Sequence, residues 1–426
     1  MGKIHSEVQA EHLIQFRGER DILSHFLTGF DVNWARSRTA FKTSLSVYIL
    51  EPENYIQEAF GFNFGIALFI PHYDSIQPRT MQAVAKFLNE EPLRGRVDRL
   101  IFFLYLRDKT QRSKVSQYTN EFAFGWIPIV FTPDELEVIN TEHWGLRNAI
   151  ARQIFARDLF DRHLPLRSDL QFFGRDALLF DLNDAIATGL NRGLFGLRKT
   201  GKTSVIFKLH RLNAGGQNII VYLDCKVPEV RNLHWEALLS LMADIVILYY
   251  KDSAVRDLPW EKLLSLMADK VAVNKELGNL SGAGRLRKAV SLVKQQTRIC
   301  FVFDEIEYIS FFARLDPHWC EEYINFWQTL WSLQSTQGNI SFIICGVNAL
   351  VAETDAVKGI QNPLFGIVKA HYLTGLKKEE LSRMVEFFGT RMGLKFSEDA
   401  IEVLWARYGG HPLAFPKGVQ FFPFSG

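Results

Sequence analysis

One segment of the sequence has residue types and spacing that suit phosphate binding. Gly196-Leu-Arg-Lys-Thr-Gly201-Lys202-Thr203 matches the pattern G-x-x-x-x-G-K-[ST] of a Walker A loop. Glycines permit a tight loop whose backbone N–H groups face phosphate oxygens, and a helix expected from Lys202 to about Leu212 adds its positive N-terminal end. Lys202 supplies charge to the β- and γ-phosphates, and the Thr203 hydroxyl can bind Mg²⁺. The predicted nucleotide contacts from this loop are Gly196, Leu197, Arg198, Lys199, Thr200, Gly201, Lys202 and Thr203.

A pair of carboxylates follows an apolar run later in the chain. Ile299-Cys-Phe-Val-Phe-Asp304-Glu305 is typical of a buried strand that ends in a Walker B element. Asp304 is predicted to hold Mg²⁺, directly or through water, and Glu305 is the natural base to deprotonate the attacking water. Such a pair is weak evidence alone. It becomes strong evidence here because it follows a phosphate-binding loop, with one predicted strand between the two motifs. The two motifs together predict ATP hydrolysis, with ATP and Mg²⁺ as cofactors.

The strands that must position these motifs can be read from short apolar runs bounded by turn or charged residues. The predicted strands of this region are Gly193–Leu197, Asn218–Asp224, Arg298–Asp304, Ile340–Gly346 and Ile367–Thr374. By likeness to P-loop ATPases with a base beside the Walker B carboxylate, we expect one strand to be inserted between the loop strand and the Walker B strand. Ser341–Gly346 is the predicted insertion. Asn348 at its end is either a sensor between the γ-phosphate and the attacking water or an ordinary loop residue.

The chain is predicted to be α/β, with a three-layer P-loop ATPase (ASCE/AAA-like) domain and a helical lid, preceded by a separate α/β domain. The N-terminal strands are predicted at Leu45–Leu50, Gly65–Ile70, Leu100–Leu106 and Ile127–Phe131, with a helix around Arg79–Asn89. Near-continuous apolar strands with helices between them favour a mostly parallel sheet covered on both faces. We expect an N-terminal domain of effector or signalling role over 1–165, the ATPase domain over 166–376 and the lid over 377–426. The predicted lid helices are Glu379–Gly393 and Ser397–Tyr408.

Four segments together resemble a known family. Phe173-Gly174-Arg175, the Walker pair, Asn362-Pro-Leu-Phe365 and Gly409-Gly-His-Pro412 are similar to the STAND and archaeal-type ATPases, the AAA-related signal-transduction NTPases near the Orc/Cdc6 initiators. The resemblance covers roughly residues 170–413. It implies that His411 and Pro412 pack on the adenine, and that Gly174 and Arg175 contact the nucleotide from the other side. The alternative for Gly409–Pro412 is a helix C-cap followed by proline.

The sequence departs from that family near its end. After the Gly-x-Pro segment the family has a further helix, a winged helix and usually a repeat array that senses a ligand. Here Pro416 and Pro423 interrupt the chain instead. We therefore expect a truncated lid, or a sensor located elsewhere.

Composition limits the choice of partners. The sequence has 49 Lys and Arg against 47 Asp and Glu, a formal charge of +2, so no global field favours nucleic acid or a membrane. The longest apolar stretch, Leu241–Tyr250, contains Asp244 and is too short to span a bilayer. The four cysteines show no metal or disulfide spacing, which favours a reducing cytoplasm. Besides the nucleotide, we expect a protein partner or self-association; nucleic acid is not favoured, and no membrane is expected.

Several weaker signals have ordinary interpretations. Trp235–Asp244 recurs with one change as Trp260–Asp269, which we interpret as a duplicated amphipathic helix with a structural role. Arg314, Arg198 and Arg192 are rival candidates for an arginine finger, against solvated side chains. The polar residues after two N-terminal strands complete no nuclease, NAD-cleaving or protease constellation, and loop polarity is favoured for them: they are His72, Asp74, Asp108 and Lys109.

The function predicted from these motifs is an ATP-binding and hydrolysing switch of the STAND/AAA type that regulates an N-terminal effector, for example in a defence or stress response. One alternative is a nucleic-acid-associated ATPase of the Orc/Cdc6 kind, against which the near-neutral charge and the missing winged helix count. The other is a non-hydrolysing, nucleotide-stabilised scaffold, against which the intact Asp304 and Glu305 count.

Overall fold

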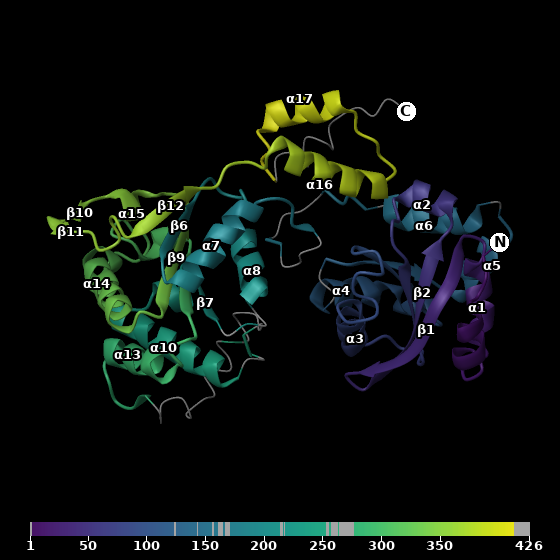
Figure 1. The fold of residues 1–426 in the computed structure, drawn as a ribbon, viewed down its shortest axis with the longest axis horizontal. Coiled ribbons are helices and arrows are strands. Elements are labelled where there is room, and N and C mark those ends of the chain that lie inside the picture. Colours follow the sequence, from purple (N-terminus) through teal and green to yellow (C-terminus); the bar gives the residue numbers. More distant parts are fainter. Residues whose placement is uncertain are drawn as a thin grey trace.

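The protein contains two five-stranded sheets, each flanked by helices, and a helical lid above them (Figure 1). The computed structural model describes residues 2–122, 125–142, 144–155, 157–160, 165–166, 171–213, 216, 218–252, 255–256, 263 and 277–412. The predicted boundary at His163–Arg167 falls largely outside the described residues, as does the chain after Pro412. Among the helices formed by the described residues, none combines the length and apolar character needed to cross a bilayer.

The first sheet has the strand order β1-β2-β3-β4-β5. Its elements, in chain order, are η1 (Val8–His12), α1 (Glu19–Phe26), β1 (Phe30–Ala40), β2 (Thr43–Pro52), α2 (Asn54–Phe60), β3 (Ile66–Pro71), α3 (Pro78–Leu88), β4 (Ile101–Tyr105), η2 (Lys109–Gln111), α4 (Arg112–Phe122), β5 (Ile127–Phe131), α5 (Pro133–Ile139) and α6 (Gly145–Phe155). We call residues 2–160 the N-terminal unit. The four predicted strands and the helix around Arg79–Asn89 are present, as β2 to β5 and α3.

The expectation of a mostly parallel N-terminal sheet is wrong for half of its pairings. β3, β4 and β5 are parallel, but β2 runs antiparallel to both β1 and β3. β1 was not predicted because it is rich in polar residues and has no apolar run. Phe41 and Lys42 connect β1 to β2 with φ of 52° and 58°, the backbone of a two-residue hairpin turn that Asn and Gly usually form.

The second sheet is entirely parallel and has the order β12-β6-β9-β8-β7. Its strands are β6 (Asn191–Phe195), β7 (Ile219–Asp224), β8 (Ile299–Asp304), β9 (Ile340–Gly346) and β12 (Val368–Tyr372), close to the predicted bounds. β9 lies between β6 and β8, as expected for the inserted strand. β6, β8 and β9 are buried along their whole length because the crossover helices of a parallel sheet cover both sides, whereas the edge strand β12 is partly exposed.

The helices of this sheet form the two outer layers of a three-layer arrangement (Figure 1). α7 (Asp176–Thr188) and α8 (Lys202–Asn213) pack on one face, and α10 (Trp235–Lys251), α13 (Gly282–Leu292) and α14 (Trp319–Gln337) pack on the other. The shorter elements are α9 (Pro228–Arg231), η5 (Ile306–Ile309), α15 (Leu350–Glu353), β10 (Ala356–Val357) and β11 (Ile360–Gln361). The first copy of the repeat opens α10. The second copy, 260–269, lies outside the described residues except for Leu263, which is buried.

The lid consists of α16 (Lys378–Arg391) and α17 (Glu398–Tyr408), close to the two predicted helices. It shares one apolar cluster with the N-terminal unit, in which Leu381 and Phe388 of α16 join Phe60 of α2 and Ile154 of α6. In Figure 1 the lid lies over both halves of the molecule, with α16 beside α2. A Cβ on Gly61, which follows α2, would lie 2.5 Å from a methyl group of α16, so the two helices approach closely.

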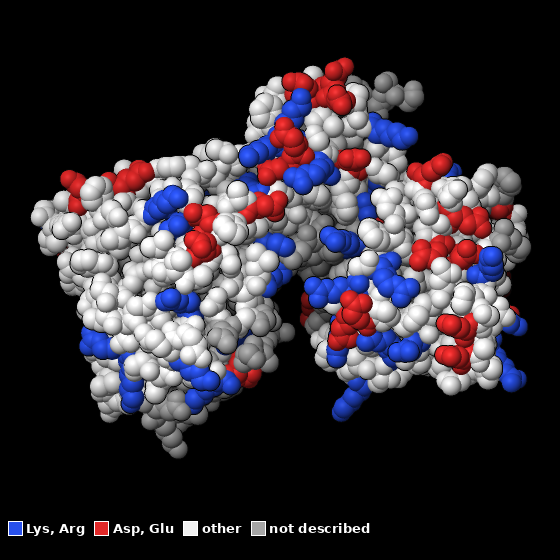
Figure 2. Space-filling view, viewed as in Figure 1, with Lys and Arg blue, Asp and Glu red and all other residues white. Residues whose placement is uncertain are grey.

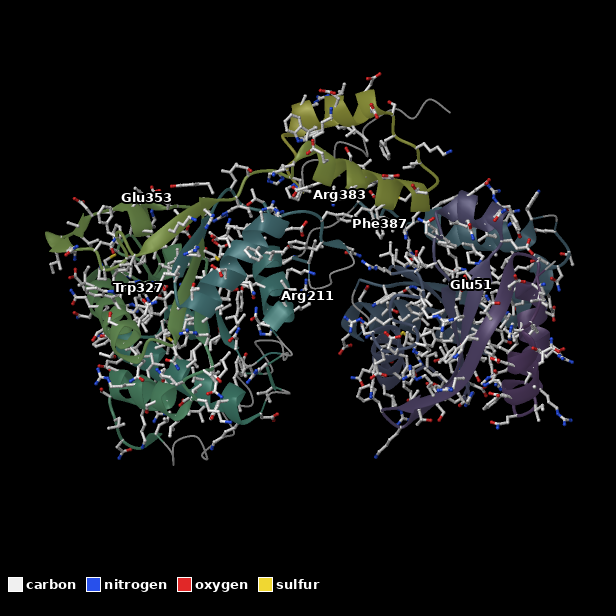
Figure 3. All side chains as sticks on the ribbon, viewed as in Figure 1. Glu51, Arg211, Trp327, Glu353, Arg383 and Phe387 are labelled. Atoms are coloured by element: carbon white, nitrogen blue, oxygen red, sulfur yellow. The ribbon has the colours of Figure 1, made fainter. Side chains whose placement is uncertain are left out.

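A buried ion pair reinforces this contact. Arg391 of α16 donates from Nη2 to Asp98 Oδ2 over 2.6 Å, and Asp98 has no solvent exposure. The other oxygen of Asp98 accepts the N–H groups of Leu100 and Ile101 at 2.8 and 2.9 Å. The guanidinium also lies over the ring of Phe387 on the same helix, which is labelled in Figure 3. The lid is therefore anchored to the N-terminal unit by both apolar and ionic contacts. Below it, Figure 2 shows a hollow between the two halves.

Candidate nucleotide-binding site

The phosphate-binding pattern forms the loop between β6 and α8. Gly201 has φ of +97°, which only glycine adopts without strain. A Cβ on Gly196 would lie 2.7 Å from the carbonyl oxygen of Leu373, so that position also requires glycine. Lys202 begins α8, and its ammonium donates to the carbonyls of Gly196 and Leu197 at 2.8 and 3.0 Å. The lysine thus bridges the mouth of its own loop, with its charge held where the pattern predicts phosphates.

The two predicted metal ligands are in direct contact. Thr203 Oγ1 donates to Asp304 Oδ2 over 2.8 Å, across residues that lie far apart in the chain. Tyr222 on β7 donates to the same oxygen at 3.0 Å. Asp304 is 2% exposed, and burial raises the pKa of its carboxyl group. A hydroxyl and a carboxylate oxygen beside a phosphate loop are the hard oxygen ligands that Mg²⁺ prefers, so this pair of residues fits the ion.

Glu305 stands directly beside this pair and lines the same cavity as the loop. Its backbone is left-handed, with φ of 53°, and its N–H donates to Asp304 Oδ1 at 3.0 Å. Burial, together with repulsion from Asp304 and Glu307, raises the pKa of Glu305. A carboxylate with a raised pKa and access to the cavity is suited to accept a proton from water.

Arg175 connects the loop to the lid. Its guanidinium donates to the carbonyl of Thr200 in the loop at 2.7 Å and to that of Thr374 at 3.2 Å. Its backbone N–H donates to Glu380 of α16 at 2.9 Å. Gly174 before it has φ of +69°, and a Cβ there would overlap the Glu380 side chain. Burial lowers the pKa of Arg175 to about 10, which leaves the guanidinium charged near neutral pH.

The Gly409–Pro412 segment closes the cavity from the lid side. Leu376 donates its N–H to the carbonyl of Gly410 at 2.8 Å, and a Cβ on Gly410 would lie 2.1 Å from the Leu376 carbonyl oxygen. Gly409 also ends α17 as its left-handed C-cap, as the alternative interpretation of the segment anticipated. Pro412 lines the cavity, whereas His411 is not among the lining residues.

These parts enclose one cavity of about 410 Å³ between the second sheet and the lid. Leu376, Met384 and Phe388 form its lid wall. Leu159 and Phe160 of the N-terminal unit also reach it, and Phe160 packs edge-on against Phe388. A nucleotide in the cavity would therefore touch the loop, the lid and the end of the N-terminal unit at once.

Most of the other predicted residues do not line this cavity. Asn348 follows β9, but its side-chain oxygen accepts the N–H of Leu350 at 3.0 Å and caps α15. Asn362 is buried and donates to the carbonyls of Val351 and Thr354, so its turn is held by structural contacts. Of the arginine-finger candidates, Arg198 lines the cavity, Arg314 is exposed, and Arg192 is paired with Asp181 at 2.6 Å.

Three polar residues of the site were not predicted from sequence. Tyr222 binds Asp304, and Glu380 binds Arg175. Glu307 accepts the N–H groups of Val347 and Asn348 and so ties the end of β9 to the Walker B loop. Tyr222 lies two residues before one predicted strand end and Glu307 lies three residues after another, and polar residues so close to strand ends are candidates for a site at that edge of the sheet. Nothing in the sequence around Glu380 indicates its partner.

Comparison with known proteins gives partial structural resemblances. No family model matches the chain, and no curated protein matches it in sequence. A Walker-type ATPase of Pyrococcus abyssi is similar over 61% of this chain and 69% of its own, at 16% identity and a TM-score of 0.42. A signal transduction ATPase with numerous domains (STAND) and a tetratricopeptide repeat sensor, from Pyrococcus horikoshii, is similar over 59% of this chain at 17% identity and a TM-score of 0.33. This chain spans only 30% of that structure.

The ORC2 protein of Aeropyrum pernix, in complexes with ADPNP and ADP, is similar over 63% of this chain and 65% of its own, at 13% identity and a TM-score of 0.35. Each of these three similarities is partial and at low identity.

Proposed function

We propose that this protein is an ATP-binding and ATP-hydrolysing switch of the STAND/AAA type. The observation that carries the proposal is the contact between Thr203 and Asp304 at 2.8 Å, with Lys202 and Glu305 lining the same cavity. This juxtaposition supplies a phosphate ligand, an Mg²⁺ site and a base within one enclosure. Four residues from two separated motifs would not converge in this way by their local sequence alone.

Each residue has a defined task in this proposal. The loop amides and Lys202 bind the β- and γ-phosphates, and the ammonium exchanges its two loop carbonyls for phosphate oxygens. Thr203 and Asp304 would hold Mg²⁺, which neutralises charge on the phosphates when it is bound. Glu305 orients the attacking water and accepts its proton. The raised pKa of Glu305 favours that proton transfer.

We further propose that the lid and the N-terminal unit respond to the nucleotide as one body. The Asp98–Arg391 ion pair and the shared apolar cluster join them. Arg175 and Glu380 connect the lid to the phosphate loop. Because the nucleotide would contact both walls of the cavity, its hydrolysis would change the angle between the second sheet and the lid, and with it the position of the N-terminal unit. In this proposal the motion is the signal, and a protein partner or a second copy of the chain responds to it.

The binding step is tested by Lys202→Ala. This change deletes the main charge that the loop directs at the terminal phosphates. ATP with Mg²⁺ should raise the melting temperature of the parent protein by mass action and leave the variant nearly unmoved. Lys288→Ala, at an exposed position of α13, is the matched control and should respond like the parent. If ATP raised the melting temperature of the parent and of Lys202→Ala by the same amount, the proposed nucleotide site would be contradicted.

The Orc/Cdc6-like alternative makes a different prediction. DNA should then stimulate ATP hydrolysis, and binding should weaken steeply with salt because phosphate contacts release counterions. On the face shown in Figure 2, acidic and basic side chains are interspersed. This pattern and the formal charge of +2 support a switch acting on a protein rather than on nucleic acid.

A further inference from the structure

A second cavity lies in the N-terminal unit, at the carboxyl ends of its three parallel strands. It has a volume of about 620 Å³ and shares no lining residue with the nucleotide cavity. His72 follows β3, Arg107 follows β4, and Pro133 begins α5 directly after β5; all three line it. In α/β sheets this edge is where ligands are bound, because the strand ends leave a crevice between their connections. The start of α1 closes the cavity from the side.

A largely buried polar network forms part of the floor of this cavity, which it reaches through Glu19 and His72. Glu19 is 4% exposed and accepts the hydroxyl proton of Tyr48, which is fully buried. Ser46 Oγ lies 3.2 Å from His12 Nε2 and 2.8 Å from His72 Nε2. Five polar side chains from three separate segments are thus gathered under an open cavity. Burying them requires compensating hydrogen bonds, and a purely structural floor would be more simply made of apolar residues.

The hydrogen bonds of this network allow His72 to act as a donor. Ser46 has a single hydroxyl proton, so it can donate to one imidazole and accept from the other. In the tautomer in which His12 Nε2 donates to Ser46, the hydroxyl of Ser46 donates to His72 Nε2. His72 then carries its remaining proton on Nδ1, and an anion bound at that nitrogen would select this tautomer.

Two arginines line the same cavity. Arg17 and Arg107 are exposed, and neither side chain forms an ion pair or hydrogen bond with any part of the chain that the structure describes. Three carboxylates also line the cavity: Asp21 and Glu137 are exposed, and the buried Glu19 accepts the hydroxyl proton of Tyr48. Ile22 and Leu136 form an apolar part of the cavity wall. The cavity therefore offers two guanidinium groups and an imidazole N–H for an anion, beside a surface for an apolar group.

We propose that this cavity binds a small organic phosphate, with Arg17, Arg107 and His72 holding the phosphate group and Ile22 and Leu136 contacting the remainder of the molecule. Guanidinium groups bind phosphate through paired, charge-assisted hydrogen bonds. A volume of about 620 Å³ is within the range of small-molecule sites and exceeds what inorganic phosphate alone would fill. Glu19, through Tyr48 and the two histidines, positions the imidazole of His72 rather than touching the ligand.

The test measures protection of these side chains in the full chain. Phenylglyoxal modification of arginines and diethylpyrocarbonate modification of histidines are mapped by mass spectrometry, with phenyl phosphate and inorganic phosphate as probes. Phenyl phosphate should slow modification of Arg17, Arg107 and His72, and do so at lower concentration than inorganic phosphate. Arg94, an exposed arginine before the opposite end of β4, is the internal control and should react at an unchanged rate.

Variants separate this cavity from the nucleotide site. Arg107→Ala should weaken the protection of His72 about tenfold or more, the usual effect of one charged hydrogen bond, whereas Arg94→Ala should not alter it. Lys202→Ala should retain full protection. The proposal is overturned if neither probe protects His72 at millimolar concentration, or if protection disappears in Lys202→Ala. If inorganic phosphate and phenyl phosphate protected equally well, the proposed contact of an organic group with Ile22 and Leu136 would be overturned.

Discussion

The buried ion pair between the lid and the N-terminal unit allows their coupling to be tested directly. Arg391→Met keeps an apolar stem over Phe387 but removes the donor that lies 2.6 Å from Asp98 Oδ2. Asp98 has no solvent exposure and would keep only the N–H groups of Leu100 and Ile101. Breaking a buried pair in this way costs about 3–5 kcal/mol, because one charge is left uncompensated. At about 1.4 kcal/mol for each factor of ten, the docked lid should be disfavoured by roughly 10²–10⁴-fold.

Hydrogen exchange measured by mass spectrometry is the appropriate assay, because it reports local opening of each element. In Arg391→Met, the amides of α16 should exchange faster by up to the same factor, and ATP should lose part of its effect on the N-terminal unit. Arg383→Met on the same helix is the control, since Arg383 is exposed and forms no described ion pair (Figure 3). Adding Asp98→Asn to Arg391→Met should restore part of the protection, because no charge then remains buried. Exchange in Arg391→Met equal to that in Arg383→Met would refute the coupling.

Three further changes test other parts of the site. Glu305→Gln should preserve ATP binding but lower turnover, measured as phosphate release, about 10²–10⁴-fold. An unchanged rate would place the base elsewhere. If the parent protein never hydrolyses ATP, the alternative of a non-hydrolysing, nucleotide-stabilised scaffold would be favoured. Arg175→Met removes the donor to Thr200 in the loop, and fluorescence anisotropy should show roughly tenfold weaker binding of a labelled ATP analogue. The Arg192 guanidinium lowers the pKa of Asp181 from 3.8 to about 2, so this carboxylate stabilises the fold above about pH 4 and loses that effect as the pH falls toward 2. The melting-temperature difference between the parent and Asp181→Asn should therefore shrink over that pH range, and a constant difference would contradict the assignment.

Much of the nucleotide site could be predicted from sequence because its parts are local. The phosphate loop needs glycines and a lysine at fixed spacing between a strand and a helix, so Gly196–Thr203 can be found without any knowledge of the fold. The central strands β8 and β9 are equally visible, since burial on both faces makes each one a nearly continuous apolar run. β9 was placed between β6 and β8 by resemblance, and the pairings confirm it. By contrast, β1 was missed because a polar edge strand carries no such run.

What the sequence could not show is which distant surfaces meet. The apolar face of α16 predicts burial but not its partner, and only the tertiary structure joins it to the N-terminal unit. Arg391 and Asp98 are 293 positions apart, and Glu380 and Arg175 are 205 apart. The polar network of the N-terminal unit likewise depends on His12, Ser46 and His72 converging from three segments, although the sequence around His72 predicts only an ordinary polar loop. The phosphate-binding loop can be predicted because its residues are adjacent in the sequence and act largely through their own backbone. The contacts between distant residues form only when the folded chain packs their side chains together and away from water, and local sequence does not specify that packing.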